Sequence, residues 1–218
     1  GMVVVGLARR QYKIKQLAED LSKEPGKLYA LKADMRKEED ILAAFEWVEK
    51  ELGGADVLVN NAGLARCTYI RDGKTEDWRN MWEVNVLAVT ICMREYLKSM
   101  ENRKNQKGQI IIINSIAGHT TELLKGNMYI ATKHAVRAIS QCLRRELAEK
   151  NSTIKVTNIS PGLTRSEATE EMLALLDESQ AAMEGADVAN AVIAALSTSS
   201  VAQVCELIIT SIPNKILY

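Results

Sequence analysis

Residues 108–118 read GQIIIINSIAG, and this stretch decides the fold of the 218-residue chain. Four isoleucines in a row leave the segment without a polar face, so it does not match a strand that has one side in water. Such a strand is typical of a parallel sheet that helices cover on both sides. Asn114 and Ser115 follow directly, so two polar residues are expected where the strand ends.

The segments on both sides of this strand alternate between apolar runs and helical patterns. Further strands are expected at residues 2–8, 28–34, 55–63, 153–162 and 202–210. Helices are expected at residues 12–22, 38–52, 75–100 (as one helix or two), 128–149, 167–180 and 187–196, with Asp187 capping the last. The alternation predicts one α/β domain over residues 1–218, with a doubly wound, mostly parallel sheet and a ligand site at the carboxyl ends of its strands.

The composition excludes several classes of function. Hydrophobic residues make up 47% and charged residues 26% of the chain, which is ordinary for a soluble globular domain. The 28 Lys and Arg residues balance the 28 Asp and Glu residues, so the chain lacks the basic excess that nucleic-acid binding needs. No apolar run approaches the roughly 18 residues of a membrane span. Residues 1–10 do not match a signal peptide, because their positive charges follow the apolar run.

The cysteines and histidines do not form a metal-binding pattern. The chain has no CxxC pair, and His119 and His134 have no Cys or His cluster near them. Packing in the core or at the surface is therefore expected for both histidines. The cysteines are expected to be free thiols in a reducing compartment, which favours a cytoplasmic location. They are Cys67, Cys92, Cys142 and Cys205.

Three consecutive predicted strands end in small polar residues with Gly or Pro. The first ends in Asn60-Asn61-Ala62-Gly63, the second in Asn114-Ser115, and the third in Ser160-Pro161-Gly162. Each ending alone is also good turn chemistry. Because the three endings meet at one edge of a parallel sheet, together they predict a site at which the backbone approaches a flat ligand closely.

Tyr129 and Lys133 lie one helical turn apart at the start of the next predicted helix. The pair could simply pack a helix surface, or it could transfer protons. A lysine ammonium near a phenol favours the phenolate and lowers the tyrosine pKa from its usual value of about 10. With the Ser115 hydroxyl holding a carbonyl or alcohol oxygen nearby, this arrangement suits reversible carbonyl reduction, provided that a cofactor supplies hydride.

These motifs together resemble a known family. NNAG at 60–63, Asn85 in VNVLA, Ser115 in INSIAG, YIATK at 129–133 and SPG at 160–162 occur in the order and spacing of the short-chain dehydrogenase/reductases. The resemblance covers nearly the whole chain and implies a Rossmann-like fold. NNAGLAR, NVLAVTICMRE and NSIAGH are most similar to the member-eleven group of this family, which includes the insect farnesol dehydrogenases.

The resemblance implies roles for the matching residues. Tyr129 would be the general acid/base, Lys133 would tune it and bind the nicotinamide ribose, and Ser115 would orient the substrate oxygen. Asn85 would hold a helix kink and a water molecule of the proton relay. Ser166 stands where the family usually has a threonine and would meet the carboxamide. The remaining cofactor contacts would come from Asp34 and Met35 beside the adenine, Asn61, Ala62 and Gly63 along the adenosine, and Pro161 and Gly162 at the nicotinamide.

The end of the first predicted strand bears on the choice of nicotinamide cofactor. An NAD enzyme places an acidic residue there to accept from the ribose 2′-hydroxyl. This chain has Arg9 and Arg10 instead, and a guanidinium pairs well with a 2′-phosphate. The alternative is a solvated basic turn. We expect NADP as the cofactor.

The family's first β-α unit has no counterpart in the sequence. Its Gly-rich turn, Thr-Gly-x-x-x-Gly-x-Gly, would present backbone N–H groups to the pyrophosphate, and the motif is not found here. Without the central strand of this unit, the strands at 2–8 and 55–63 would face a gap with unpaired backbone groups. Either the chain is part of a longer protein, which we favour, or it is a truncated form whose sheet closes differently or borrows a strand.

The sequence thus predicts an NADP-dependent oxidoreductase for a hydrophobic alcohol or carbonyl compound, such as a terpenoid or steroid. The alternative is a catalytically silent binding or regulatory protein on the same scaffold. Residues 163–186 are expected to form a substrate lid, or else an ordinary surface excursion, and its apolar residues favour a hydrophobic substrate: Met172, Leu173, Leu175, Leu176 and Met183.

The helices expected at 86–100 and 129–149 carry apolar residues on more than one face. Such helices pair across two-fold interfaces in this family, which predicts a homodimer or homotetramer. The alternative is that the chain's own loops cover these faces.

Overall fold

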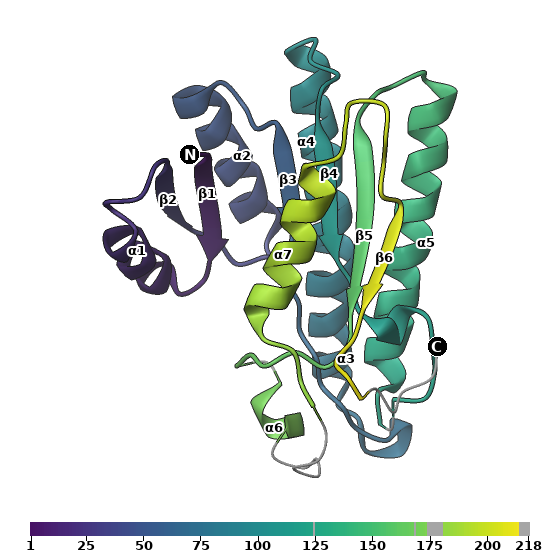
Figure 1. Cartoon of the computed structure of the whole chain (residues 1–218). Helices are drawn as coiled ribbons and strands as arrows, with labels where there is room; N and C mark the ends of the chain where they lie inside the picture. The colour runs from purple at the N-terminus through teal and green to yellow at the C-terminus, as the bar shows by residue number, and fades with distance from the viewer. Residues whose placement is uncertain (124, 168, 174–180, 214–218) are drawn as a thin grey trace.

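The computed structural model describes residues 1–218 except 124, 168, 174–180 and 214–218. Its strands form two parallel sheets (Figure 1). The larger sheet has the order β3-β4-β5-β6, and the smaller one pairs β1 with β2. The strands are β1 (Val3–Ala8), β2 (Lys27–Lys32), β3 (Val57–Asn60), β4 (Gln109–Ile113), β5 (Lys155–Pro161) and β6 (Glu206–Ile209).

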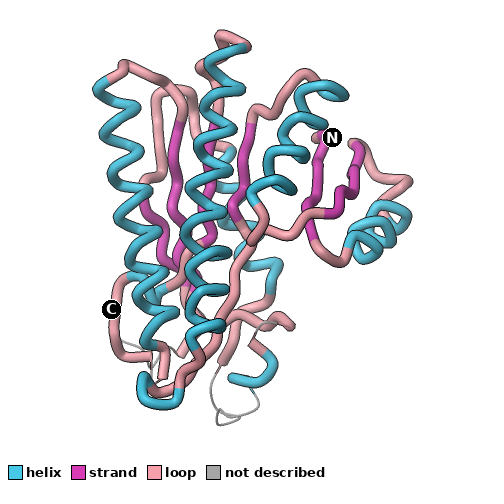
Figure 2. Tube along the Cα trace, turned by 180° about the vertical axis from the view of Figure 1, so that it is seen from behind, coloured by secondary structure: helices cyan, strands magenta, loops and turns pink. Residues whose placement is uncertain are grey.

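Helices connect the strands and cover the larger sheet on both faces, as Figure 2 shows from behind. The α-helices are α1 (Gln11–Asp20), α2 (Glu38–Leu52), α3 (Thr75–Trp82), α4 (Ala88–Asn102), α5 (Asn127–Glu149), α6 (Glu170–Leu173) and α7 (Gly185–Leu196). A π-helical turn, η2 (Glu83–Leu87), joins α3 to α4, and two 3-10 turns, η1 (Ile70–Asp72) and η3 (Ile116–Gly118), lie in loops.

The isoleucine run of β4 explains why both faces of the larger sheet are covered. Ile110 and Ile112 pack with α4 and α5 in one core cluster, whereas Ile111 packs with Ala191 and Ala195 of α7 in another. All three isoleucines are at most 1% exposed. Successive strand residues point to opposite faces, so a run without polar residues requires apolar cover on both.

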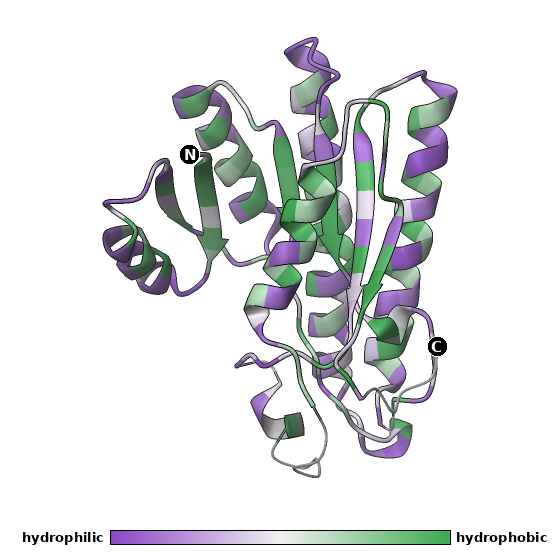
Figure 3. Ribbon diagram, in the orientation of Figure 1, coloured by the Kyte–Doolittle hydropathy of each residue, from purple (hydrophilic) through white to green (hydrophobic). Residues whose placement is uncertain are grey.

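The smaller sheet is much less buried, although its strands are as apolar as those of the larger one (Figure 3). Met2, Val3 and Val4 are 59%, 58% and 48% exposed. Helix α1 covers this sheet, and Ile14 lies so close to Gly6 that a Cβ there would meet its Cγ2 at 2.9 Å. None of the residues of α1 is buried.

Several expectations about the elements are confirmed by the structure. The six predicted strands are present and all pair in parallel, and the α/β class with helices on both faces of the sheet is correct. The helical region at 75–100 consists of two α-helices with the π-helical turn between them. Strands β1 and β3 belong to different sheets. That a further β-α unit belongs between these strands stays a prediction.

Two expectations need correction or restriction. Asp187 is not the N-cap of α7: Glu184 holds that position, and Asp187 accepts its backbone N–H at 2.8 Å within a capping box. In such a box the Ncap and N3 side chains each accept the backbone N–H of the other residue, so an Asp can contribute from N3 and its identity alone does not show which position it holds. Of the helix expected at 167–180, α6 covers Glu170–Leu173, and residues 174–180 lie outside the described residues.

None of the helices in the described ranges combines the length and apolar character that a bilayer span requires.

Candidate active site

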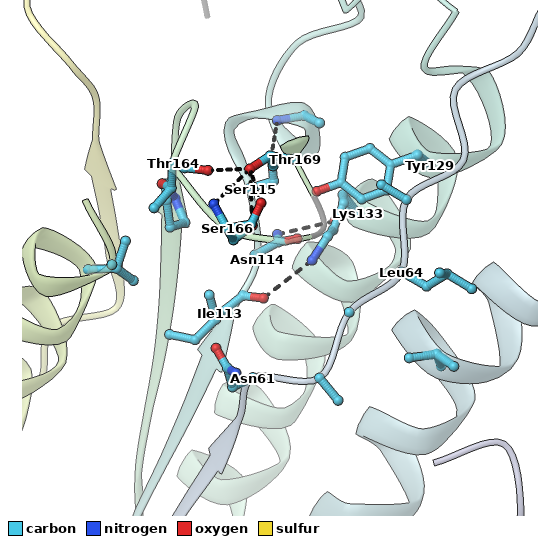
Figure 4. A pocket seen from close by; sticks show the side chains of 18 of the residues that line it. Asn61, Leu64, Ile113, Asn114, Ser115, Tyr129, Lys133, Thr164, Ser166 and Thr169 are labelled. Atoms are coloured by element: carbon cyan, nitrogen blue, oxygen red, sulfur yellow. Dashed lines mark hydrogen bonds between the residues drawn. The ribbon is translucent and has the colours of Figure 1, made fainter. Parts of the chain in front are cut away.

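A cavity of about 1130 Å³ lies at the carboxyl ends of β1, β2, β3, β4 and β5. The strand-end residues and the start of α5 converge there, and Figure 4 shows part of the wall. Of the candidate residues predicted from sequence, every one except Asn85 lines it: Arg9, Arg10, Asp34, Met35, Asn61, Ala62, Gly63, Ser115, Tyr129, Lys133, Pro161, Gly162 and Ser166.

Tyr129 and Ser115 meet at the wall of this cavity. The Tyr129 hydroxyl points toward the Ser115 side chain (Figure 4). Ser115 follows β4 and its Oγ accepts the backbone N–H of Ala117 at 3.1 Å, so the serine caps η3. The local turn therefore fixes the serine, and the first turn of α5 fixes the tyrosine.

Lys133 lies one turn further along α5 and is 5% exposed. Its Nζ donates to the Ile113 carbonyl oxygen at 3.3 Å and lies 5.6 Å from the centroid of the Tyr129 ring. Burial lowers the Lys133 pKa to about 8. The ammonium is thus directed at the strand end that also carries Ser115, and it loses part of its usual preference for the proton.

The Tyr129 pKa departs from expectation. We expected Lys133 to lower it, but the net shift is upward, because burial of the phenol outweighs the opposing effect of the hydrogen bond with Ser115. Desolvation disfavours a phenolate, as it does any buried anion. In this arrangement Tyr129 holds its proton at neutral pH and is suited to donate it.

The loop after β4 approaches α5 so closely that only glycine fits. A Cβ at Gly118 would lie 2.8 Å from Nδ2 of Asn114 and 2.9 Å from the Lys133 carbonyl oxygen. The same Asn114 Nδ2 donates to that oxygen at 3.2 Å. Because Gly118 has no side chain, the segment after β4 can approach α5 closely, and the hydrogen bond from the Asn114 amide holds it against the helix that carries Tyr129 and Lys133.

Asn85 lies behind the cavity wall, in the π-helical turn, and is 2% exposed. Its Oδ1 accepts the Leu64 N–H and its Nδ2 donates to the Leu64 carbonyl oxygen, both at 2.8 Å. Nδ2 also donates to Thr132 Oγ1 at 3.1 Å, and Thr132 in turn donates to the Tyr129 carbonyl oxygen. Asn85 therefore ties the loop after β3 to the tyrosine helix. The expected helix distortion is present, and the water of the relay stays a prediction.

The cavity wall at the ends of β1 and β2 is charged. Asp34 accepts from Arg36 Nη2 at 2.6 Å and from Nε at 3.0 Å, and these bonds lower its pKa to about 2. Arg10 pairs with Glu167, which also pairs with Lys13. Glu167 comes from the segment before α6, so this ion pair joins the smaller sheet to the expected lid.

The opposite wall contains the end of β5 and the residues after it. The Gly162 N–H donates to the Ile209 carbonyl oxygen at 2.7 Å, so the neighbouring strand β6 holds the turn. Ser166 is exposed, and its Oγ lies 3.0 Å from Thr169 Oγ1, which donates to the Thr164 carbonyl oxygen (Figure 4).

Three contributors to the site were not among the predicted site residues. Arg36 fixes Asp34, Asn114 fixes the Lys133 backbone, and Thr132 receives the Asn85 amide. Arg36 could have been found as a basic residue two positions after an acidic strand end. Asn114 directly precedes Ser115, and Thr132 lies inside the Tyr-to-Lys motif, but their bonds depend on contacts between distant segments.

Comparison with known proteins agrees with this geometry. Residues 1–175 match the family model described as short chain dehydrogenase. The chain is 42% identical to a farnesol dehydrogenase from Aedes aegypti, covering 99% of this chain and 88% of that protein. It is also 42% identical to dehydrogenase/reductase SDR family member 11 from Gallus gallus, covering 95% of this chain and 85% of the relative.

Solved structures give the same result. The serine dehydrogenase from Escherichia coli superposes with a TM-score of 0.80 at 30% identity, covering 96% of this chain and 86% of that one. A closed form of serine dehydrogenase complexed with NADP+ gives 0.83 at 28% identity, covering 100% and 90%. On the matched motifs, the fold and these relatives, the chain belongs to the short-chain dehydrogenase family of oxidoreductases.

Proposed function

We propose that this protein is an NADP-dependent oxidoreductase that interconverts a hydrophobic alcohol and its carbonyl compound. The observation that carries the proposal is the convergence of Ser115, Tyr129 and Lys133 on one cavity at the strand ends. Farnesol dehydrogenase is the name of one relative, and NADP+ is bound in a related structure. These names support the proposed substrate class and cofactor.

The three side chains have separate tasks in the proposed reaction. Tyr129 donates its phenolic proton to the carbonyl oxygen as the alcohol forms and takes a proton back in the reverse direction. Ser115 binds the same oxygen beside it. Lys133, held by the Ile113 carbonyl, stabilises the phenolate that remains after proton donation.

The donor set of the cavity fits an NADP molecule, whose nicotinamide supplies or accepts the hydride when bound. Arg9 and Arg10 offer guanidinium groups at the end of β1, which suit a 2′-phosphate. Asn61, Ala62 and Gly63 are exposed along the middle of the cavity, and Gly162 lies opposite them at the end of β5. Arg10 would exchange its present partner Glu167 for the phosphate.

The remaining part of the cavity favours a hydrophobic substrate. Leu123, Leu163, Ala181 and Val188 contribute to its lining. The lid residues expected to make it apolar do not add to this lining: neither Leu173 nor Met183 is among the residues that line the cavity, and Met183 is buried and bridges to Thr164. Leu175 and Leu176 lie outside the described residues, and the side chain of Met172 is likewise not described. A terpenoid, a steroid or a compound of similar polarity fits this lining better than a sugar or an acid.

The test is oxidation or reduction of the nicotinamide, followed at 340 nm, with terpenoid, steroid and small carbonyl or alcohol substrates. We expect turnover with NADPH to exceed turnover with NADH. The rival function, a silent binding or regulatory protein, predicts no turnover and no NADPH binding in a calorimetric titration. A folded protein that neither binds NADPH nor turns over any of these substrates would contradict the proposal.

Two further parts of the proposal concern the protein's setting. The four cysteines are all free thiols, which supports a cytoplasmic protein. A homodimer or homotetramer is proposed from the family's use of the helices equivalent to α4 and α5 in subunit pairing. Light scattering at several protein concentrations tests the latter.

A further inference from the structure

A polar network built around the buried Asn158 and Ser160 lies next to the active site but has no part in the proposed proton transfer. It begins at His119, directly after η3, whose cap is Ser115. His119 Nε2 lies 2.9 Å from Ser160 Oγ. Ser160 is completely buried and directly precedes Pro161 and Gly162 at the end of β5. The ends of β4 and β5 are already neighbours, since the Asn114 N–H donates to the Ile159 carbonyl oxygen at 2.7 Å. The His119–Ser160 contact adds a side-chain link just beyond this last backbone bond, between the segment that follows β4 and the last residues of β5.

The network continues away from the cavity and is anchored in two other elements. Asn158 Nδ2 lies 3.4 Å from Ser160 Oγ and donates to Glu206 Oε2 on β6 at 2.8 Å. Arg144 Nη2 on α5 donates to Glu206 Oε1 at 2.9 Å, and its Nη1 donates to the Cys205 carbonyl oxygen at 3.0 Å. A chain of hydrogen bonds through Asn158, Glu206 and Arg144 thus holds Ser160 on one side, while His119, from the segment after η3, contacts it on the other.

We propose that His119 is a positioning residue, whose hydrogen bond to Ser160 sets the separation between the Ser115 loop and the Pro161–Gly162 wall. This inference rests on the proposed function, in which the substrate oxygen binds at Ser115 and the nicotinamide borders Gly162. The distance between these walls then fixes the distance between the hydride donor and the carbonyl carbon. A displacement of about 1 Å in such a geometry can lower a rate by about 10²-fold.

The electrostatic surroundings keep this contact a bond between neutral groups. His119 faces Arg137 and His134 on α5 and Glu206 on β6, whose Oε2 is 3.9 Å from Nε2. Burial has the largest effect on the His119 pKa and lowers it; Arg137 and, most weakly, His134 also lower it, whereas Glu206 raises it by less than Arg137 lowers it. A neutral imidazole at neutral pH can therefore be replaced by a neutral amide of similar reach.

Two amide substitutions at His119 distinguish a role in positioning the Ser115 segment from a role in packing alone. The amide of glutamine reaches about as far as Nε2 of histidine, whereas that of asparagine falls short of it. We expect His119→Gln to keep kcat within about threefold, because only the misplacement of the two walls is costly. We expect His119→Asn and Ser160→Ala each to lower kcat by about tenfold or more, with a smaller change in substrate KM. His134→Gln serves as the matched control, since it removes the other histidine and leaves the Ser160 contact.

The primary isotope effect and the kcat of a double variant are two measurements that a loss of stability alone would not change in the way expected here. With NADPH deuterated at the transferred position, the primary isotope effect on kcat should rise in His119→Asn and stay at the wild-type value in His119→Gln. The double variant His119→Asn/Ser160→Ala should be no slower than the slower single variant, because both break one bond. Wild-type kcat and isotope effect in His119→Asn, or multiplied losses in the double variant, would overturn the inference.

A measurement without turnover keeps this inference separate from the proposed function. Hydrogen exchange read by mass spectrometry should show faster exchange in residues 116–120 and 161–164 together in His119→Asn, and unchanged exchange in His119→Gln. If the wild type proves inactive but this paired response is present, the proposed function fails and the link between the walls stands. If exchange in the two segments is unchanged, the link itself fails.

Discussion

The four-stranded sheet and the two-stranded sheet have similar strand sequences but very different burial. Ile111 in β4 has no exposed surface, whereas Val3 and Val4 in β1 are 58% and 48% exposed. The larger sheet has helices on both faces, and α1, which packs on the smaller one, has no buried residue. Apolar strand composition therefore predicts the strand but not how well the strand is covered.

The two regions also divide the candidate site between them. Ser115, Tyr129 and Lys133 belong to the well-buried larger sheet and its helix α5, whereas Arg9, Arg10 and the Asp34 carboxylate belong to the smaller sheet and the loops at its strand ends. Chemistry that needs fixed distances lies where packing is dense. The groups proposed to choose the cofactor lie where the chain is more exposed.

The largest effect is expected from removing the proposed proton donor of the larger sheet. Tyr129→Phe should lower kcat by about 10²- to 10⁴-fold, because general acid/base catalysis contributes about that much. Stability and NADPH affinity should stay close to those of the wild type. Steady-state kinetics, thermal unfolding and calorimetry check the three expectations, and more than a few per cent residual activity would remove Tyr129 from this role.

A pair of core and surface substitutions tests the difference in burial directly. Ile111→Ala should lower the free energy of unfolding by about 2–5 kcal/mol, because it leaves a cavity in a sealed core. Val4→Ala truncates a half-exposed strand residue by one carbon fewer and should cost less than about 1 kcal/mol, a gap larger than the extra carbon explains. Urea unfolding measures both. Equal losses would mean that the smaller sheet is as well packed as the larger one.

The third prediction concerns cofactor choice at the smaller sheet. Arg9→Ala/Arg10→Ala should weaken NADPH binding by at least about 10- to 100-fold, since the loss of even one hydrogen bond to a charged group costs about 1.5–3 kcal/mol. NADH, which lacks the 2′-phosphate, should bind as before. Glu167→Gln is the control of opposite sign: it frees Arg10 and Lys13 and should tighten NADPH binding. Equal losses for both cofactors in calorimetric titrations would show that the arginines do not read the phosphate.

The smallest effect is a pH dependence at Asp34. Arg36 lowers the pKa of this carboxyl from its ordinary 3.8 to about 2, so the ionised form stabilises the fold above about pH 4, and this contribution is lost as pH falls toward 2. Asp34→Asn should be slightly less stable than the wild type at pH 6, because Arg36 is partly exposed and solvent screens the pair. Thermal unfolding from pH 6 downward should show the difference in stability between the wild type and Asp34→Asn becoming smaller. A difference that grows as the pH falls would contradict the assignment.

Much of the fold and the membership of the site followed from local sequence patterns. The isoleucine run, the strand-end residues and the Tyr129–Lys133 spacing depend on near neighbours along the chain. The isoleucine run forms a strand covered on both faces, as predicted, and most of the strand-end residues line one cavity with Tyr129 and Lys133 at the carboxyl ends of the strands. The sign of the Tyr129 pKa shift was wrong because desolvation depends on tertiary packing. The bond of Arg10 to Glu167, 157 residues away, has no local signal at all.

The π-helical turn at Glu83–Leu87 gives the region around Asn85 an unusual sensitivity to chain length. A π turn holds one residue more than an α turn, so deleting one residue there would restore a continuous α-helix from α3 into α4. Each residue of an α-helix advances the side-chain direction by about 100°, so such a deletion would rotate the side chains on one side of the deletion relative to those on the other side. The Asn85 amide could then no longer reach Leu64 and Thr132 together. Insertions and deletions, more than substitutions, should be the changes that this helix does not tolerate.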